Sequence, residues 1–152
     1  MRGHRHFLLA GSPGAGKTSL CAALLGDTGP VRKTQSLEFY GRVMVDLPGE
    51  YLVHPQWRRC LLAAAADVDA LVYVQAADRA ADGVPWDLFR AVPKIRLIGV
   101  ISKTDAPGAD TAQARKNLLR FGVETPVHEV SIYKPETVAL LRSWLVEQGL
   151  FS

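Results

Sequence analysis

An eight-residue glycine-rich stretch near the amino terminus constrains the fold more than any other feature of the chain. It begins at Gly11 and ends at Thr18, and its letters, GSPGAGKT, match the pattern GxxxxGK[ST] in full. An apolar run at residues 6–10 precedes it, and a helical pattern at residues 17–25 follows it. In this strand–loop–helix context the glycines let successive backbone N–H groups point inward at an anion. The stretch therefore predicts an α/β fold whose first strand leads into a phosphate-binding turn.

Within this turn, different residue types have different expected roles. The helix that follows adds the positive end of its dipole. The Lys17 ammonium is expected to bridge the β- and γ-phosphates of a nucleotide, and the Thr18 hydroxyl to ligate Mg²⁺. The alternative is a glycine-rich turn without a ligand. The nucleotide-binding candidates of this segment are Gly11, Ser12, Pro13, Gly14, Ala15, Gly16, Lys17, Thr18 and Ser19.

Apolar runs alternate with helical patterns along the rest of the chain. We expect strands at residues 6–10, 37–40, 43–46, 70–75, 95–101 and 127–130, and helices at 17–25, 57–66, 84–92, 110–121 and 136–147. The second and third strands are expected to form a short hairpin around Gly41. Such alternation is typical of βαβ units, in which a mostly parallel sheet carries helices on both faces. We therefore expect one α/β domain over residues 1–152, with six strands or slightly fewer.

Composition and charge exclude several classes of protein. Of the 152 residues, 48% are hydrophobic and 22% are charged, which excludes a disordered, collagen-like or coiled-coil chain. The apolar runs are shorter than the ~18 residues that span a bilayer, and no secretory pattern follows the basic residues at the start. The net charge of +3 comes from scattered bases, so we expect neither a nucleic-acid partner nor a membrane. Cys21 and Cys60 are interpreted as core residues in a reducing cytosol.

A second motif, Asp46-Leu-Pro-Gly49, follows the third expected strand. A carboxylate at that strand end can complete the Mg²⁺ shell, and the Gly49 N–H can meet the γ-phosphate; the alternative for Asp46 is a capping residue. Thr34 lies between the first helix and this motif. It either closes over the nucleotide and gives Mg²⁺ a second hydroxyl, or is an ordinary loop threonine. The metal-ligand candidates are Thr18, Thr34 and Asp46.

A third motif, Ser102-Lys103-Thr104-Asp105, ends the strand expected at residues 95–101. The Asp105 carboxylate can accept hydrogen bonds from guanine N1–H and the exocyclic amine together, whereas adenine offers no such pair of donors. The Lys103 stem can lie along the base plane, and the backbone around Ser131 can meet the guanine carbonyl. The alternative is a turn that caps a helix. The base-binding candidates are Ser102, Lys103, Asp105 and Ser131.

Taken in this order, the motifs resemble those of the guanine-nucleotide-binding P-loop proteins. More narrowly, the stretches KTQSLEFYG at residues 33–41 and DLPGEY at 46–51 resemble the EutP/PduV family, small P-loop proteins encoded with ethanolamine- and propanediol-utilization microcompartments. The resemblance implies a P-loop NTPase fold with a small, G-domain-like sheet. It implies Mg²⁺ and GTP or GDP as cofactors, with ATP as the alternative. It also implies a cytoplasmic protein at a bacterial microcompartment, with a shell protein as a partner.

The resemblance brings two activities: GTP hydrolysis, from the wider class, and acetate kinase activity, which is ascribed to ethanolamine-type members. The chain departs from the wider class in three ways. Ser102 stands where Asn or Thr is usual, and only 12 positions separate Thr34 from Asp46. Glu50 stands where Ras-like proteins place the Gln that orients water.

Because a γ-phosphate repels a carboxylate, the Glu50 departure predicts slow hydrolysis. The catalytic candidates are Lys17, Thr34 and Glu50. We predict a slow GTPase. The alternatives are acetate kinase-type phosphoryl transfer and a non-catalytic, nucleotide-bound docking module for a shell protein.

Overall fold

The computed structural model describes residues 7–11, 14–26, 38–40, 44–46, 56, 58–66, 68–79 and 95–151. The elements follow in the order β1 (Phe7–Gly11), α1 (Lys17–Leu25), β2 (Glu38–Tyr40), β3 (Met44–Asp46), α3 (Arg58–Ala66), β4 (Ala70–Ala76), β5 (Arg96–Ser102), α5 (Thr111–Arg120), β6 (Glu124–Glu129) and α6 (Pro135–Glu147). No helix among these residues is long and apolar enough to cross a membrane.

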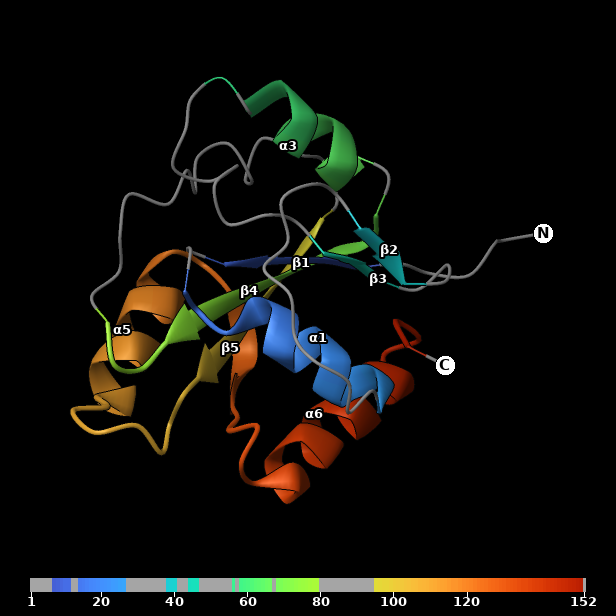
Figure 1. Cartoon of the computed structure of the whole chain (residues 1–152). Coiled ribbons are helices and arrows are strands. Elements are labelled where there is room, and N and C mark those ends of the chain that lie inside the picture. Colours follow the sequence, from blue (N-terminus) through green and yellow to red (C-terminus); the bar gives the residue numbers. More distant parts are fainter. Residues whose placement is uncertain are drawn as a thin grey trace.

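The strands form one six-stranded sheet in the order β2-β3-β1-β4-β5-β6 (Figure 1). Every neighbouring pair is parallel except β2 and β3, which form the predicted antiparallel hairpin. Gly11 pairs with Val74, and Ala76 pairs with Ser102, so the carboxyl ends of β1, β4 and β5 meet at one edge. Ligands of open α/β sheets bind at this edge. The sheet thus brings together the loops after β1 and β5, which carry two of the predicted motifs.

The core has two layers, one on each face of the sheet. Because successive side chains of a strand point to opposite faces, Phe7 and Leu9 pack in a cluster with α1 and α6, whereas Leu8 and Ala10 pack in a cluster with α3 and α5. Figure 1 shows α1 and α6 side by side on one side of the sheet. All of β1 is buried, as expected for a strand that is covered on both faces. The predicted α/β architecture with helices on both faces is confirmed.

Most predicted bounds agree with the structure to within one or two residues, but the last strand does not. It runs Glu124–Glu129 rather than 127–130, and it is an edge strand that pairs only with β5. Only Val127 within it is buried, so it lacks the apolar run from which a strand is predicted. The helix expected at residues 84–92 lies outside the described residues, as does Gly41.

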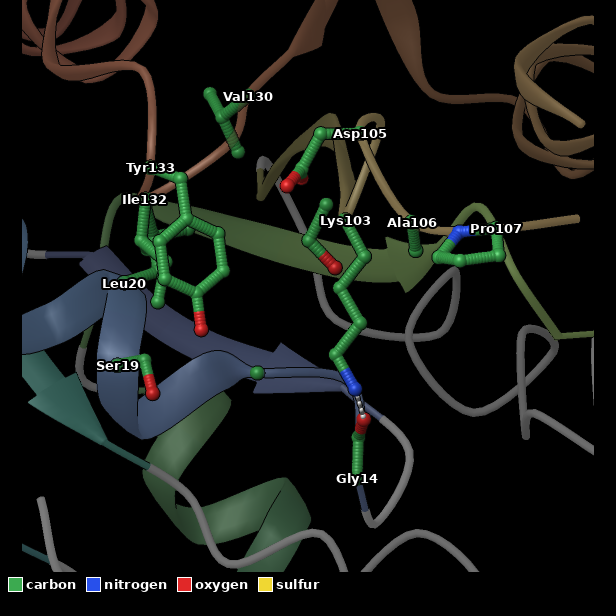
Figure 2. A pocket seen from close by; sticks show the side chains of 12 residues that line it. Gly14, Ser19, Leu20, Lys103, Asp105, Ala106, Pro107, Val130, Ile132 and Tyr133 are labelled. Carbon is green, nitrogen blue, oxygen red and sulfur yellow. Dashed lines mark hydrogen bonds between the residues drawn. The ribbon is translucent and has the colours of Figure 1, made fainter. Parts of the chain in front are cut away.

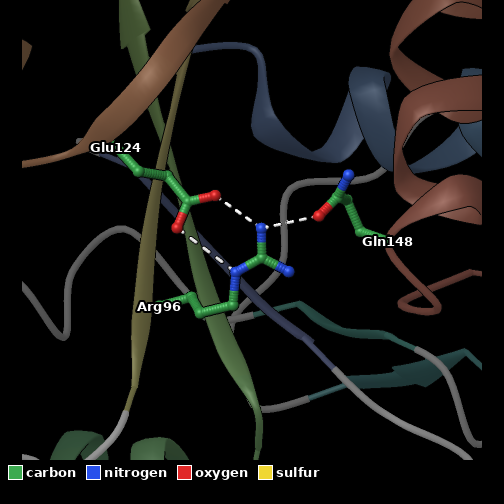
Figure 3. A network of polar contacts seen from close by, with 3 residues as sticks. All are labelled: Arg96, Glu124 and Gln148. Atoms are coloured by element: carbon green, nitrogen blue, oxygen red, sulfur yellow. Dashed lines mark hydrogen bonds and ion pairs between the residues drawn. The ribbon is translucent and has the colours of Figure 1, made fainter.

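At the opposite edge of the sheet, one arginine joins three elements (Figure 3). The Nε of Arg96, at the start of β5, donates a 3.2 Å hydrogen bond to Glu124 of β6. A second nitrogen of its guanidinium donates a 2.9 Å hydrogen bond to Gln148, just beyond α6. The hydrogen bond to Glu124 raises the pKa of Arg96, so the guanidinium stays charged. The network fastens the carboxyl-terminal helix to the sheet at the edge away from the motifs.

Candidate functional site

Residues 14–16 form a turn that leads into α1. Gly14 has φ 81°, and Gly16, the N-cap residue of α1, has φ 82°; both values lie in the left-handed region that favours glycine. At Gly11 the reason is space, since a β-carbon there would lie 2.8 Å from the carbonyl oxygen of Val74. The backbone path between strand and helix therefore requires glycine at these three positions of the motif.

The first turn of α1 brings the polar residues of this loop together. Lys17 is 6% exposed, and Thr18 and Ser19 are half-buried. The amide groups in the first turn of a helix have no partners within the helix, and the helix dipole favours negative charge there. The turn thus offers backbone donors, an ammonium and two hydroxyls, which is the chemistry that binds a phosphate.

The loop after β5 is fastened to this glycine-rich loop by two hydrogen bonds. The Ser102 hydroxyl, 5% exposed, donates a 2.6 Å bond to the carbonyl oxygen of Ala15. The Lys103 Nζ donates a 2.7 Å bond to the carbonyl oxygen of Gly14. Lys103 has φ 56°, a value that residues with a β-carbon adopt infrequently. The two predicted motifs are therefore one connected structure, although 87 positions separate Ser102 from Ala15.

Asp105 and Ser131 form a second polar pair beside the same loop. The Ser131 hydroxyl donates a 2.7 Å hydrogen bond to Oδ1 of Asp105 and accepts a 3.2 Å bond from the Tyr133 N–H. The Ser131 N–H donates to the Thr137 hydroxyl at 2.9 Å. Ser131 is 1% exposed, and Asp105 is exposed. An anchored serine therefore holds an accessible carboxylate in a fixed orientation.

A cavity of about 500 Å³ lies between these groups. Figure 2 shows Lys103 extending along one side of it to Gly14, with the Tyr133 ring on the other side and the Asp105 carboxylate at one end. The lining residues are Gly14, Gly16, Ser19, Leu20, Ser102, Lys103, Asp105, Ala106, Pro107, Val130, Ile132 and Tyr133. The glycine-rich loop and the Ser102–Asp105 motif therefore open into one space, which has a mostly apolar end beside Asp105.

Similarity to known proteins shows which family the chain belongs to. The family model described as "Ethanolamine utilisation - propanediol utilisation" (PduV-EutP) matches residues 4–147. The chain belongs to the PduV-EutP family. The resemblance carried by residues 33–41 and 46–51 is confirmed.

Three relatives in this family are similar over most of the chain. The "Probable acetate kinase EutP" of Escherichia coli (strain K12) is 42% identical over 141 residues, which are 93% of this chain and 89% of the relative. The protein of the same name from Salmonella typhimurium is 40% identical over 141 residues, with the same coverage. The "Propanediol utilization protein PduV" of Citrobacter freundii is 28% identical over 149 residues, which are 95% of this chain and 78% of the relative.

Among solved structures, a "probable GTP-binding protein engB" matches with a TM-score of 0.66 and 18% sequence identity. The match covers 93% of this chain and 97% of that chain. At this identity the likeness shows the fold, which is that of an α/β P-loop NTPase. The predicted G-domain-like fold of this PduV-EutP chain is confirmed.

Several predicted site residues lie wholly or partly outside the described residues. Asp46 ends β3, and its backbone pairs with Leu9 of β1, which comes shortly before the glycine-rich loop. Its side chain lies outside the described residues. Five further candidates lie entirely outside the described residues: Ser12, Pro13, Thr34, Gly49 and Glu50. Among the described residues no group of three or more His, Cys, Asp or Glu side chains could hold a metal ion.

The structure adds one cation that the sequence did not point to. The guanidinium of Arg79, in the turn after β4, lies against the glycine-rich loop, and its nearest nitrogen would be 2.9 Å from a β-carbon at Gly14. The side chain of Gln75, 5% exposed, holds this turn by donating a 3.2 Å bond to the Arg79 carbonyl oxygen. A single basic residue after an apolar strand gives no signal in the sequence, because only the fold brings it to Gly14.

Sequence reasoning also missed part of the cavity wall, namely Leu20, Ala106, Pro107 and Tyr133. Tyr133 stands two positions after Ser131, in a turn that is closed by a 3.0 Å hydrogen bond from the Lys134 N–H to the Ser131 carbonyl oxygen. The nearness of Tyr133 to a predicted site residue was the one signal available. It does not show on which side of the turn the ring lies.

Proposed function

We propose that this PduV-EutP chain binds guanine nucleotide with Mg²⁺ and hydrolyses GTP slowly at a bacterial microcompartment. One observation carries the proposal. The Asp105 carboxylate and the glycine-rich loop border the same cavity of about 500 Å³. The hydrogen bond from Lys103 to Gly14 joins the loop that carries Asp105 to the glycine-rich loop. A molecule with a base at one end and phosphates at the other fits that arrangement.

The glycine-rich loop is the proposed phosphate site. Its backbone N–H groups and the start of α1 would hold the phosphate oxygens, and Lys17 would neutralise charge on the β- and γ-phosphates. Thr18, in the first turn of α1, is the proposed first Mg²⁺ ligand. Asp46 ends the strand beside β1, and with Thr34 it would complete an all-oxygen set, which is what Mg²⁺ prefers. Bound Mg²⁺ would offset the negative charge that develops on the transferred phosphoryl group.

The Asp105 carboxylate is the proposed base reader. Ser131 engages its Oδ1 at 2.7 Å, which fixes the carboxylate without removing its capacity to accept further hydrogen bonds. Guanine presents two adjacent donors to such a group, at N1 and at the exocyclic amine. Adenine presents no such pair. We therefore favour GTP over ATP as the nucleotide.

Slow turnover is proposed from Glu50. Its carboxylate follows the Asp46–Gly49 motif, where a γ-phosphate would repel it. Unaided G domains hydrolyse GTP at about 10⁻⁴–10⁻² s⁻¹, and we expect a rate in this range.

Two other functions are alternatives to GTP hydrolysis. The first is phosphoryl transfer from the nucleotide to acetate, supported by the name "Probable acetate kinase" that relatives with 40–42% identity carry. An acetate oxygen would attack the γ-phosphorus, the bond to the β–γ bridging oxygen would break, and the nucleoside diphosphate would leave. The second is a nucleotide-bound docking module for a shell protein, which would bind nucleotide without turnover.

One assay separates these functions. The protein is incubated with Mg²⁺ and GTP or ATP, with and without acetate, and inorganic phosphate, acetyl phosphate and nucleoside diphosphate are measured. We expect phosphate to be released slowly from GTP, at a rate that acetate does not change. Acetyl phosphate formed in step with diphosphate would instead establish the kinase, and stable binding without products would establish the docking module. Lys17→Ala, checked for folding by circular dichroism, is the control and should lose nucleotide binding.

A further inference from the structure

Tyr133 is an exposed aromatic residue beside the cavity, with 79% of its surface accessible. Aromatic side chains contribute most when they bury their large apolar faces, so a tyrosine this exposed gives little to the fold. Its backbone is nevertheless fixed. The Tyr133 N–H donates to the Ser131 hydroxyl at 3.2 Å, and Ser131 in turn is held by Asp105 and Thr137. The same serine therefore positions both the carboxylate and the ring.

The opposite side of the cavity is formed by the side chain of Lys103. Its Nζ is bound to the Gly14 carbonyl oxygen at 2.7 Å, which keeps the four-carbon stem extended along the wall. Figure 2 shows this stem facing the Tyr133 ring across the cavity, with Asp105 at the end of the space between them. An aromatic ring and an alkyl chain that border one cavity favour a flat, aromatic ligand.

We propose that Tyr133 stacks on one face of the nucleobase, with the Lys103 stem on the other face, and supplies base affinity that does not depend on which purine is bound. The inference rests on the proposed function, because it assumes that a nucleotide occupies the cavity. It assigns separate tasks to two residues. Asp105 selects guanine through its edge, whereas Tyr133 holds any purine through its face, because every base has a π-face.

The test is titration calorimetry with GDP, ADP and inorganic triphosphate against the wild-type chain, Tyr133→Ala and Tyr133→Phe. Aromatic–base stacking predicts that Tyr133→Ala weakens GDP and ADP by a similar factor, about tenfold or more. Triphosphate, which has no base, should bind wild type and variant equally. Tyr133→Phe keeps the ring and should stay within about twofold of wild type, a loss no larger than a single weak contact gives.

The matched control is Leu140→Ala, which removes another large exposed side chain, 72% accessible, from α6 outside the cavity lining. It should leave all three affinities unchanged. Unchanged GDP affinity in Tyr133→Ala, or an equal loss for GDP and triphosphate, would overturn the stacking role. A wild-type chain that binds neither GDP nor ADP would instead overturn the proposed function, so the two failures are distinguishable.

Discussion

The hydroxyl of Ser102 donates a 2.6 Å hydrogen bond to the carbonyl oxygen of Ala15 and so joins the end of β5 to the glycine-rich loop. Both residues are buried, with 5% and 2% of their surfaces accessible. Ser102 stands where the wider class has Asn or Thr. The contact shows what the shorter side chain does here: it supplies one donor to one loop carbonyl. The serine at this position therefore links the two motifs.

Ser102→Ala should weaken both the fold and nucleotide binding. Removing the hydroxyl leaves the buried Ala15 carbonyl without this donor, and an unsatisfied buried polar group costs about 1–3 kcal/mol. We expect a lower midpoint of urea unfolding and a weaker GDP affinity by calorimetry. Ser102→Thr keeps the hydroxyl and serves as the control. If Ser102→Ala matches wild type in both measurements, the bond does not brace the loop.

The first part of the site could be predicted from the sequence because its geometry is local. Gly14 and Gly16 set the backbone path into α1, which has the predicted bounds, Lys17–Leu25. The nearness of Ser131 to Asp105 could be anticipated as well, since both follow neighbouring strands whose carboxyl ends meet at one edge. The hydrogen bond from the Ser131 hydroxyl to the Asp105 carboxylate was not predicted.

The rest of the site depends on contacts between distant segments. Arg79 reaches Gly14 only because β4 lies beside β1 in the sheet. The side on which the Tyr133 ring lies depends on the turn that Ser131 anchors. The predicted bounds of β6 are wrong for a related reason. Few residues of this edge strand are buried, so its hydrophobic pattern says little about where the strand begins and ends.

Asp105→Asn should reverse the base preference. Xanthine has a carbonyl where guanine has its exocyclic amine, so an amide donor suits xanthine and a carboxylate suits guanine. We expect the variant to bind GDP at least tenfold more weakly, because a hydrogen bond to a charged group is worth about 1.5–3 kcal/mol, and to gain affinity for xanthosine diphosphate. Competition binding with both nucleotides measures the change. A native chain that binds ADP as tightly as GDP would contradict the role of Asp105.

Gly14→Ala should lower both the stability of the fold and the affinity for GDP, and a control variant distinguishes the two effects. At φ 81° a β-carbon costs about 1–2 kcal/mol, and its clash partner, the end of the flexible Arg79 side chain, can move aside. Gly108→Ala is the matched control, because Gly108 has φ 78° and open space around it. We expect similar losses of stability in urea unfolding but a loss of GDP affinity only in Gly14→Ala. Equal GDP affinities would place Gly14 outside the phosphate site.

His128 should make the stability of the fold depend on pH. Its ring lies 4.4 Å from that of Trp144, its Nε2 is buried without a hydrogen-bond partner among the described residues, and burial lowers its pKa below 6.5, against an opposing effect of Glu124. Just below pH 6.5 the unfolded chain therefore binds more protons than the folded chain does. This contribution to stability is lost as the pH falls through that range. Urea unfolding across it should show a smaller decline for His128→Phe than for wild type, and parallel curves would contradict the assignment.

Glu50→Gln tests why hydrolysis is expected to be slow. A carboxylate at this position repels the γ-phosphate, whereas an amide can orient the attacking water without that repulsion, so single-turnover GTP hydrolysis should hold or rise. Thr34→Ala should slow hydrolysis further and shift its Mg²⁺ dependence, because it removes a proposed ligand. Rates are compared at saturating GTP so that differences in binding do not enter. A large loss in Glu50→Gln would make Glu50 a working base or a ligand of the metal shell, and an unchanged rate and Mg²⁺ dependence in Thr34→Ala would remove Thr34 from the site.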